Sequence, residues 1–520
     1  MNLSGLRAVC LAVPLCCFVG PAGAQLIPIK TIPIAQGDQF QLFPSDNLGM
    51  GGVTIALPDS IGDPYVNPAT TVRVRASRFF SSPTVYNVSD DAGGGRSLPF
   101  ALLARRGNWF GGLAIALQQV EPSRPPNPQG GGFVAQAPQQ PPGSDVGGNI
   151  VPPVPGPDSR AHGNEYAFGT IGRTWPGRNL SVGASVMWTG LHALDGVDLL
   201  YNGSRRITQT GDAVDLRAGA LKEWPGERGA RSLEAIVFHN SFATTHDVLY
   251  ADLVWDPGQQ LFIEQARTDT NYDHTNTWGA QLQYEIPLAT PGWRIGWLAT
   301  ANRATHPKIP NYDLANVAVI PRDPGTSYAY NLGIGLSKVL GPARFGVDAI
   351  YEPIRSHTWA DASVPVVTFS GDTIAPGGKT IENRFSFSNA LLRIGVGRAI
   401  DLENAKRALG LQLGLVLRSI SYHLQQTDHV ELTQRALRTS WLEWTPTWGL
   451  SLRFPDLEIR YQGRVTKGAG RPGGGGNFVP VGVADMALSS GTILAAPSGP
   501  LNLVDVNTTT HQISLSLPLR

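Results

Sequence analysis

The chain has 520 residues, including 60 Gly and 41 Pro, and only 16% of its residues are charged. Average soluble globular proteins carry about 25% charged residues, so this composition is not that of a typical cytosolic enzyme. A hydrophobic fraction of 42% excludes global disorder, and a net charge of +1 without Lys/Arg blocks argues against nucleic acid as a partner.

Residues 1–24 are typical of a secretory signal peptide. Arg7 precedes an apolar stretch over residues 8–19, and a small-x-small cleavage signal ends at Ala24. The apolar stretch is too short to span a bilayer, and a retained helical anchor is the alternative interpretation. Cys10, Cys16 and Cys17 all lie in this segment. We therefore expect a mature chain without disulfides, thiolate metal sites or Cys nucleophiles.

Residues 25–70 show no alternating pattern and are too few for a separate domain. They contain a Gly-Met-Gly-Gly run, an acidic residue and an Asn-Pro-Ala run. These residues are Gly49, Met50, Gly51, Gly52, Asp59, Asn67, Pro68 and Ala69. The glycines suit close approach of the backbone inside a narrow lumen, and an Asn-Pro pair suits a fixed turn. A flexible periplasmic tail is the alternative.

From residue 71 to residue 520, apolar residues alternate with small or polar ones. In residues 328–337, Tyr, Leu and Ile alternate with Ala, Asn, Gly and Ser. This period of two is typical of β-strands, whereas no helical periodicity of that strength occurs. About 16 such segments follow one another, and many are long enough to cross a hydrocarbon core as tilted strands.

The connections between these segments alternate in length. Tight turns are expected at residues 106–108, 175–178, 289–292, 341–342 and 455–456, and longer connections at residues 121–163, 255–274, 361–383 and 468–508. Short turns at one end and long loops at the other are the pattern of outer-membrane barrels. The sequence therefore predicts an all-β fold, a transmembrane antiparallel β-barrel of about 16 strands, with 14 as the alternative count, in the bacterial outer membrane.

Several Trp residues lie near the ends of the expected strands. At such positions an amphipathic ring can sit at the headgroup level of a membrane. The residues concerned are Trp188, Trp278, Trp293, Trp297, Trp441, Trp444 and Trp448.

The motifs at residues 49–69 resemble the N-terminal hatch of the FadL-type (OMPP1/FadL/TodX-like) family, whose members transport long-chain fatty acids and aromatic hydrocarbons across the outer membrane. There, too, a Gly-Met-Gly-Gly segment and an acidic residue precede an Asn-Pro-Ala that leads into the first strand. The resemblance implies a hatch or plug at residues 25–70 and passive uptake of hydrophobic small molecules. The best-known members have fewer strands, and barrels usually end on an aromatic residue rather than on Leu519-Arg520. Barrels that serve secretion systems carry similar motifs, so a non-transporting scaffold or secretion-system component is the alternative.

Transport of this kind implies two further groups of residues. A lateral gate needs a strand that breaks its hydrogen-bond ladder, and the candidates, which could also merely curve the wall, are Gly111, Gly112, Pro353 and Pro446. A carboxylate-bearing cargo would be held by lumen-facing arginines, and the candidates are Arg217, Arg393, Arg418 and Arg460. Lumen acids such as Asp215, Asp348 and Glu458 compete for these arginines.

An enzymatic barrel is the competing class. His246-Asp247, Asp273-His274 and Asp428-His429 are expected near the extracellular rim. Adjacent residues on a strand point to opposite faces, so these neighbours cannot pair with each other. No Gly-x-Ser-x-Gly, His-Glu-x-x-His or phosphate-loop motif occurs. We expect no enzyme activity, cofactor or metal, and we expect hydrophobic ligands and outer-membrane lipid as partners. The sequence does not specify the oligomeric state.

Overall fold

A computed structural model describes most of the chain. The described residues are 39, 42–74, 76–90, 92–121, 162–193, 206–256, 258, 261–306, 325–362, 364–402, 407–472 and 503–519. The expected signal peptide at residues 1–24 and the first part of the expected hatch lie outside the described residues, as do the middles of the long connections after residues 121 and 472.

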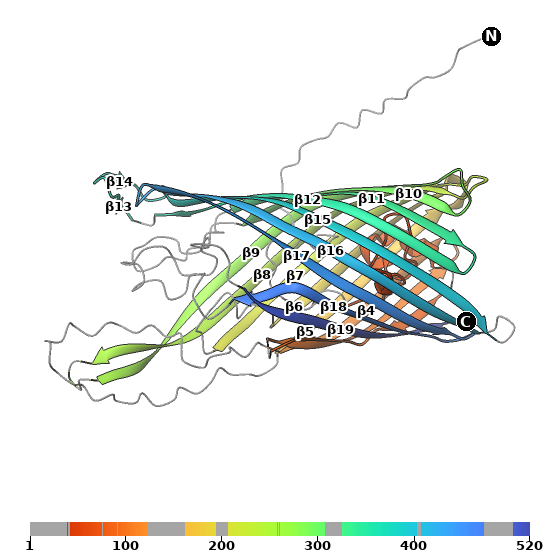
Figure 1. Ribbon diagram of the computed structural model, residues 1–520, viewed down its shortest axis with the longest axis horizontal. Helices are drawn as coiled ribbons and strands as arrows, with labels where there is room; N and C mark the ends of the chain where they lie inside the picture. Colours follow the sequence, from red (N-terminus) through yellow and green to blue (C-terminus); the bar gives the residue numbers. More distant parts are fainter. Residues whose placement is uncertain are drawn as a thin grey trace, which may run out of the picture.

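One closed antiparallel sheet forms the wall of a barrel (Figure 1). Its first strand has two parts, β1 (Arg78–Ser81) and β2 (Thr84–Val88), which pair in a common register with the same two neighbours, β3 (Gly94–Arg106) and β19 (Leu503–Pro518). With these two parts taken as one, the wall has 16 strands. The prediction of an antiparallel barrel of about 16 strands is confirmed.

The other strands follow in chain order. They are β4 (Trp109–Glu121), β5 (His162–Trp175), β6 (Leu180–Leu191), β7 (Arg206–Trp224), β8 (Arg231–Asp256), β9 (Leu261–Pro287), β10 (Trp293–His306), β11 (Gly325–Leu340), β12 (Ala343–Asp361), β15 (Lys379–Leu402), β16 (Arg407–Asp428), β17 (Thr433–Arg453) and β18 (Glu458–Pro472). Between β12 and β15, the short strands β13 (Val366–Val367) and β14 (Thr373–Ile374) form a separate hairpin. A short 3-10 turn, η3 (Pro176–Arg178), connects β5 to β6.

The hairpin of β8 and β9 is longer than expected. The loop predicted at residues 255–274 is wrong for most of its length, because β8 runs to Asp256 and β9 begins at Leu261. Residues 266–276 are mainly polar on both faces of the strand, so they lack the alternation that marks a membrane-crossing strand. The backbone ladder with β8 forms nevertheless.

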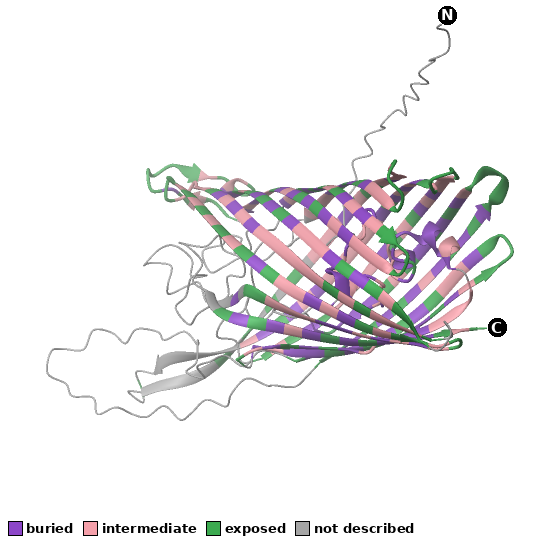
Figure 2. Ribbon diagram, turned by 45° about the vertical axis from the view of Figure 1, so that its right-hand side comes forward, coloured by how far each residue is buried: buried purple, intermediate pink, exposed green. Residues whose placement is uncertain are grey.

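Burial alternates along the strands, as Figure 2 shows. On β11 the outward Leu332 is 54% exposed, whereas the neighbouring lumen-facing Asn331 is 0% exposed. A closed barrel with an apolar outer face satisfies every backbone donor and acceptor of the wall while presenting hydrocarbon to lipid. The protein is therefore an outer-membrane β-barrel of a bacterial cell. None of the helices in the described part of the chain is long and apolar enough to cross a membrane.

Residues 42–74, which we call the plug, lie inside the barrel near its short-turn, periplasmic end (Figure 1). The plug contains the 3-10 helix η1 (Leu48–Met50), the helix α1 (Asp63–Val66) and the 3-10 helix η2 (Pro68–Arg73). η1 contacts β15, β16 and β17, and η2 contacts β5, β6 and β7 on the other side of the lumen. The plug thus bridges two opposite parts of the wall.

Candidate functional site

The Gly-Met-Gly-Gly motif forms the contact between the plug and β15–β17. Gly51 and Gly52 adopt φ values of 72° and 69°, which are favourable only for glycine. The Gly51 amide donates to the Thr447 hydroxyl at 2.9 Å, and that hydroxyl donates to the Gly49 carbonyl at 3.0 Å. Met50 between them is fully buried. One wall threonine therefore fixes the backbone of the motif.

A belt of lumen-facing glycines makes room for the plug. A Cβ added at Gly395 or Gly414 would collide with the Met50 backbone, and one at Gly296 with the Ile55 carbonyl. On the opposite wall, a Cβ at Gly183 would approach the Pro68 carbonyl carbon to 2.9 Å. Surplus glycine is thus used where the wall and the plug backbone come into direct contact.

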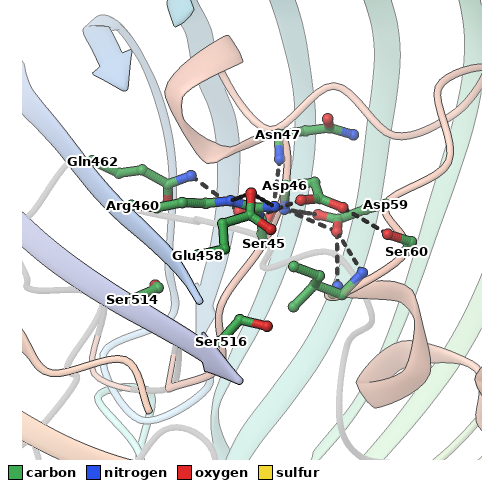
Figure 3. Close-up of polar contacts among 12 residues, drawn as sticks. Ser45, Asp46, Asn47, Asp59, Ser60, Glu458, Arg460, Gln462, Ser514 and Ser516 are labelled. Carbon is green, nitrogen blue, oxygen red and sulfur yellow. Dashed lines mark hydrogen bonds and ion pairs between the residues drawn. The ribbon is translucent and has the colours of Figure 1, made fainter. Parts of the chain in front are cut away.

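Asp59 organises the polar centre of the plug (Figure 3). Its carboxylate accepts hydrogen bonds from the Asp46 amide at 2.9 Å, the Gly62 amide at 2.8 Å and the Ile61 amide at 3.1 Å. The Ser45 hydroxyl also donates to it. One acidic side chain therefore ties the start of the plug to the turn before α1.

Asp46 anchors this centre to the wall. It forms an ion pair with Arg460 on β18, and the Arg460 guanidinium also donates to Glu458 at 2.7 Å (Figure 3). Gln462 donates to the Ser45 carbonyl at 3.0 Å, and Gln412 donates to the Asp46 carbonyl at 2.8 Å. Because the Arg460 and Asp46 side chains are only 11% and 13% exposed, this ion pair is held away from bulk solvent.

A second anchor holds the other end of the plug. Arg73 donates to Glu234 at 2.8 Å and to Glu223 at 3.2 Å. Asn67 of the Asn-Pro-Ala motif donates to Glu234 at 3.1 Å and, through its side-chain oxygen, accepts from the Ala69 amide at 3.1 Å. Asn67 is thus both the N-cap of η2 and a contact to the wall. A further contact comes from Arg217, which donates to the plug at the Val66 carbonyl.

The plug carboxylates do not share one electrostatic environment. Burial is the largest cause that raises the pKa of Asp59, and the Asp46 charge raises it further. Burial together with the charges of Asp59 and Glu234 holds the pKa of Asp63 well above its usual range. Burial alone would also raise the pKa of Asp46, but the Arg460 guanidinium and the Ser60 hydroxyl hold it below its ordinary value. Asp46 is therefore ionised where it pairs with Arg460 of the wall, whereas ionisation of Asp63 lowers the stability of the folded protein.

Asp63→Asn should stabilise the plug at pH 8 more than at pH 4.5. A raised pKa means that the folded state loses stability as pH rises from the ordinary Asp value through the folded value. The amide removes that cost and keeps an oxygen that can accept from the Asp59 amide, a bond of 2.9 Å in the native protein. The measurement is the apparent unfolding temperature of the folded barrel at both pH values. A loss of stability that is equal at both pH values would contradict the assignment.

The four predicted arginines all face protein partners. Arg217 pairs with Asp215 at 2.6 Å, Arg393 donates to the Gly52 carbonyl at 3.1 Å, and Arg460 joins Glu458 to Asp46. Arg418 lies directly opposite Glu443 on β17. Three of the four thus contact the plug, and their role in holding a carboxylate cargo stays a prediction.

The predicted strand breaks differ from one another. The ladder of β4 is regular on both sides of Gly111-Gly112. At Pro353 the ladder between β11 and β12 lacks two consecutive residue pairs, although the register continues unchanged beyond them. At Pro446 the ladder between β17 and β18 also lacks two pairs. Trp444 and Lys467 form the last pair of this ladder toward the extracellular end.

β18 leaves β17 at a bulge. The pairing of β18 with β19 shifts register between Thr466 and Ala469, and Gly468 in this bulge has a φ of 80°. Beyond it, β18 remains paired with β19, whereas the described part of β18 forms no ladder pair with residues 433–443 of β17. Figure 1 shows the two strands diverging toward the extracellular end. We call this divergence of the described strands the β17–β18 opening.

The lumen beside this opening is apolar and aromatic. Phe387 and Tyr422 are buried, and Phe385 and Trp441 pack against them. Ring centroids are 5.9 Å apart for Phe387 and Tyr422, and 5.6 Å apart for Tyr422 and Trp441. We call these four residues the aromatic patch. Trp441, predicted for the membrane interface, instead lies opposite the buried Ile420 and faces the lumen.

The aromatic patch is not among the residues predicted from the sequence, although a signal for it exists. On β15, residues 392, 394 and 396 are apolar and point to lipid, as in an ordinary barrel strand. At residues 384–388 this polarity inverts, because the Phe side chains face the lumen while Arg384 and Ser386 face outward. Such an inversion within one strand indicates where the lumen, rather than the outer face, is apolar.

The described contacts of the predicted rim residues lead to partners other than the neighbouring His or Asp, and His429 lies 3.8 Å from Glu382. His246 contacts the Thr244 hydroxyl at 3.1 Å, and Asp247 accepts from Thr270. Asp428 accepts from the backbone amides of Val430 and Glu431. The side chain of Asp273 lies outside the described part. The described residues also hold no group of three or more His, Cys, Asp or Glu able to bind a metal ion.

Comparison with known proteins adds the following findings. No protein-family model and no curated protein matches the chain. The toluene transporter TbuX of Ralstonia pickettii is 12% identical, with a TM-score of 0.37 over 92% of this chain and 100% of that one. A bacterial polysaccharide outer-membrane secretin is 6% identical, with a TM-score of 0.36 over 86% of this chain and 99% of that one. The ferric-catecholate import receptor Fiu of E. coli K12 is 7% identical, with a TM-score of 0.34 over 85% and 82%. At such low similarity, the function has to be argued from the geometry of this chain.

Proposed function

We propose that this barrel takes up hydrophobic compounds passively and releases them sideways into the outer membrane. The observation that carries the proposal is the aromatic patch, which lies on the lumen side of β15, β16 and β17, with Trp441 beside the β17–β18 opening. An apolar compound gains contact area with such rings and loses its unfavourable contact with water.

The plug supports a sideways route. It is tied to opposite parts of the wall through Thr447, Arg460 and Glu234, so a straight passage to the periplasm would require several buried polar contacts to break together. A compound that leaves where the β17–β18 opening begins, beside the outward Leu442, meets lipid there and needs no movement of the plug. Because membrane lipid is as apolar as the cargo, no energy source is required for this step.

Phe387→Ala should lower the affinity for an aromatic hydrocarbon by about tenfold, since burying one aromatic side chain stabilises a complex by roughly 1.5–3 kcal/mol and each 1.4 kcal/mol is tenfold. The measurement is equilibrium binding of radiolabelled naphthalene to the full chain in lipid nanodiscs, with binding to empty nanodiscs subtracted.

The matched control is Phe100→Ala, because Phe100 is an outward aromatic residue of β3 with 38% exposure and lies away from the patch. This variant should bind naphthalene as the native protein does. Equal loss in both variants would show that binding occurs on the outer face. Absence of binding above empty nanodiscs would remove the transport proposal and favour a scaffold or secretion-system component.

A further inference from the structure

The outer face of the barrel carries a row of polar residues near its extracellular end, and three of them are arginine cations. Arg355 on β12, Ser386 on β15, His423 on β16 and Arg438 on β17 stand opposite one another in register and point outward. The row continues to Tyr328 on β11, opposite Arg355, and to Arg303 on β10, whose guanidinium lies 6.0 Å from the Tyr328 ring centroid. Adjacent strands are about 4.8 Å apart, so the row spans roughly 24 Å.

These cations are not neutralised locally. Glu382 lies four residues from Ser386 along β15, toward the extracellular end. Its carboxylate accepts from Arg384 at 3.0 Å, Lys379 at 3.3 Å and His357 at 2.6 Å, so several cationic or titratable groups share one carboxylate. Neither Arg355 nor Arg438 forms an ion pair with any residue that the structure describes. The face therefore has an excess of positive charge and suits an anion.

Directly below the row, toward the middle of the membrane, the same strands form an apolar groove. Its volume is about 810 Å³. The small residues Ala349, Ala390 and Ser419 lie between the larger Trp297, Tyr351 and Leu442. Among these, Trp297, Tyr351 and Leu442 are 40%, 47% and 61% exposed, so the groove opens outward to lipid. Its size and composition suit acyl chains.

Hydroxyl groups connect the groove to the cations. Ser388, Ser421 and Ser440 occupy outward positions between them, and Tyr351 and Ser388 share a hydrogen bond of 3.1 Å. Hydrocarbon offers no partner to a hydroxyl, so serines at this height fit the polar junction between acyl chains and a headgroup.

The height of the row agrees with this arrangement. On β17, outward apolar residues run from Leu452 near the periplasmic end to Leu442. About ten residues of a strand tilted by about 40° rise by roughly 25 Å, which is the height of the apolar band of an outer-membrane barrel. Ser440 and Arg438 follow immediately above that band, at the level of the outer-leaflet headgroups.

We propose that this face binds a phosphorylated glycolipid of the outer leaflet, the lipid A type, with its phosphates at Arg355 and Arg438 and acyl chains in the groove. A second copy of the chain is a poor occupant, because a two-fold contact through this face would place the two cationic rows against each other. The site is on the opposite side of the wall from the aromatic patch and is independent of the proposed uptake.

The test uses the full chain purified in detergent, with purified lipid A as the probe and native mass spectrometry or titration as the readout. Arg355→Gln and Arg438→Gln should each weaken binding about tenfold, the effect of losing one charge-assisted contact. Ala390→Trp, which fills the groove from its lipid-facing side, should weaken lipid A binding without changing the cations. Arg398→Gln is the matched control, since Arg398 is an exposed outward residue at the other end of β15 and should leave binding unchanged.

Dephosphorylated lipid A tests the apolar groove without the phosphate contacts, and inorganic phosphate tests the arginines without the groove. The proposal requires both to bind more weakly than lipid A. It is overturned if inorganic phosphate binds as tightly as lipid A and Ala390→Trp has no effect, which would indicate a simple anion site. It is equally overturned if Arg355→Gln, Arg438→Gln and Ala390→Trp bind lipid A as tightly as the native protein and the control Arg398→Gln do.

Discussion

Arg460→Ala is expected to loosen the plug and destabilise the folded protein by about 3–5 kcal/mol, because removing one member of a buried ion pair leaves its partners charged and unpaired. The partners are Asp46 of the plug and Glu458 of β18. With Asp46 released, Ser45 and the hydrogen bonds around Asp59 lose their charged connection to the wall, and the Gln462 and Gln412 contacts remain. The variant should therefore unfold at a lower temperature and conduct small ions across a planar bilayer.

Arg453→Ala is the control for this prediction. Arg453 also contacts Glu458, at 3.2 Å, but it is 63% exposed and its described ion pair does not involve the plug. It should change neither the unfolding temperature nor the conductance appreciably, since exposed pairs contribute about 0–1 kcal/mol. The double variant Asp46→Ala/Arg460→Ala should recover part of the lost stability. Equal conductance of Arg460→Ala and Arg453→Ala would show that Arg460 does not hold the plug.

Deletion of Gly468 is expected to abolish the transfer of hydrophobic compounds into the membrane. A bulge is one extra residue in one strand, so removing it restores a single register between β18 and β19 and lets β18 continue beside β17. Residues 469–472 of β18 would then pair with residues 440–443 of β17, and the part of the β17–β18 opening next to Trp444 would close. The rate at which naphthalene enters cells that express this variant should fall to the rate of cells without the protein.

Deletion of Gly371 is the control for the Gly468 deletion. Gly371 also has a positive φ, of 88°, but it lies in the turn between β13 and β14, outside the wall. Its removal should leave transfer unchanged. Native transfer rates in the Gly468 deletion, with the barrel folded and present in the outer membrane, would exclude the opening as the exit.

The barrel could be predicted from the sequence because its signals are local. A period of two is visible within each strand, and residues such as Gly107 or Pro342 mark each tight turn within a few positions. The plug motifs were visible for the same reason, since Gly51 and Gly52 need their residue type for their own backbone conformation.

The partners of the candidate residues were not predictable, because they depend on which strands become neighbours. Asp46 meets Arg460 only after β18 has closed the barrel beside β19, and no pattern near either residue encodes that contact. The sequence predicts a loop from residue 468 onward, because Gly468 cannot be distinguished from the Gly-rich stretch that follows it. The aromatic patch was predictable in principle from the inverted polarity around Phe385 and Phe387.

A plugged barrel that works as proposed should pass hydrophobic compounds and exclude hydrophilic ones. The most direct measurement reconstitutes the full chain in lipid vesicles and follows two solutes of similar size, naphthalene and arabinose. The protein should accelerate the exchange of naphthalene between the buffer and the vesicle membrane, while arabinose-induced swelling should stay at the level of protein-free vesicles. Swelling in arabinose, or naphthalene exchange no faster than in protein-free vesicles, would contradict it.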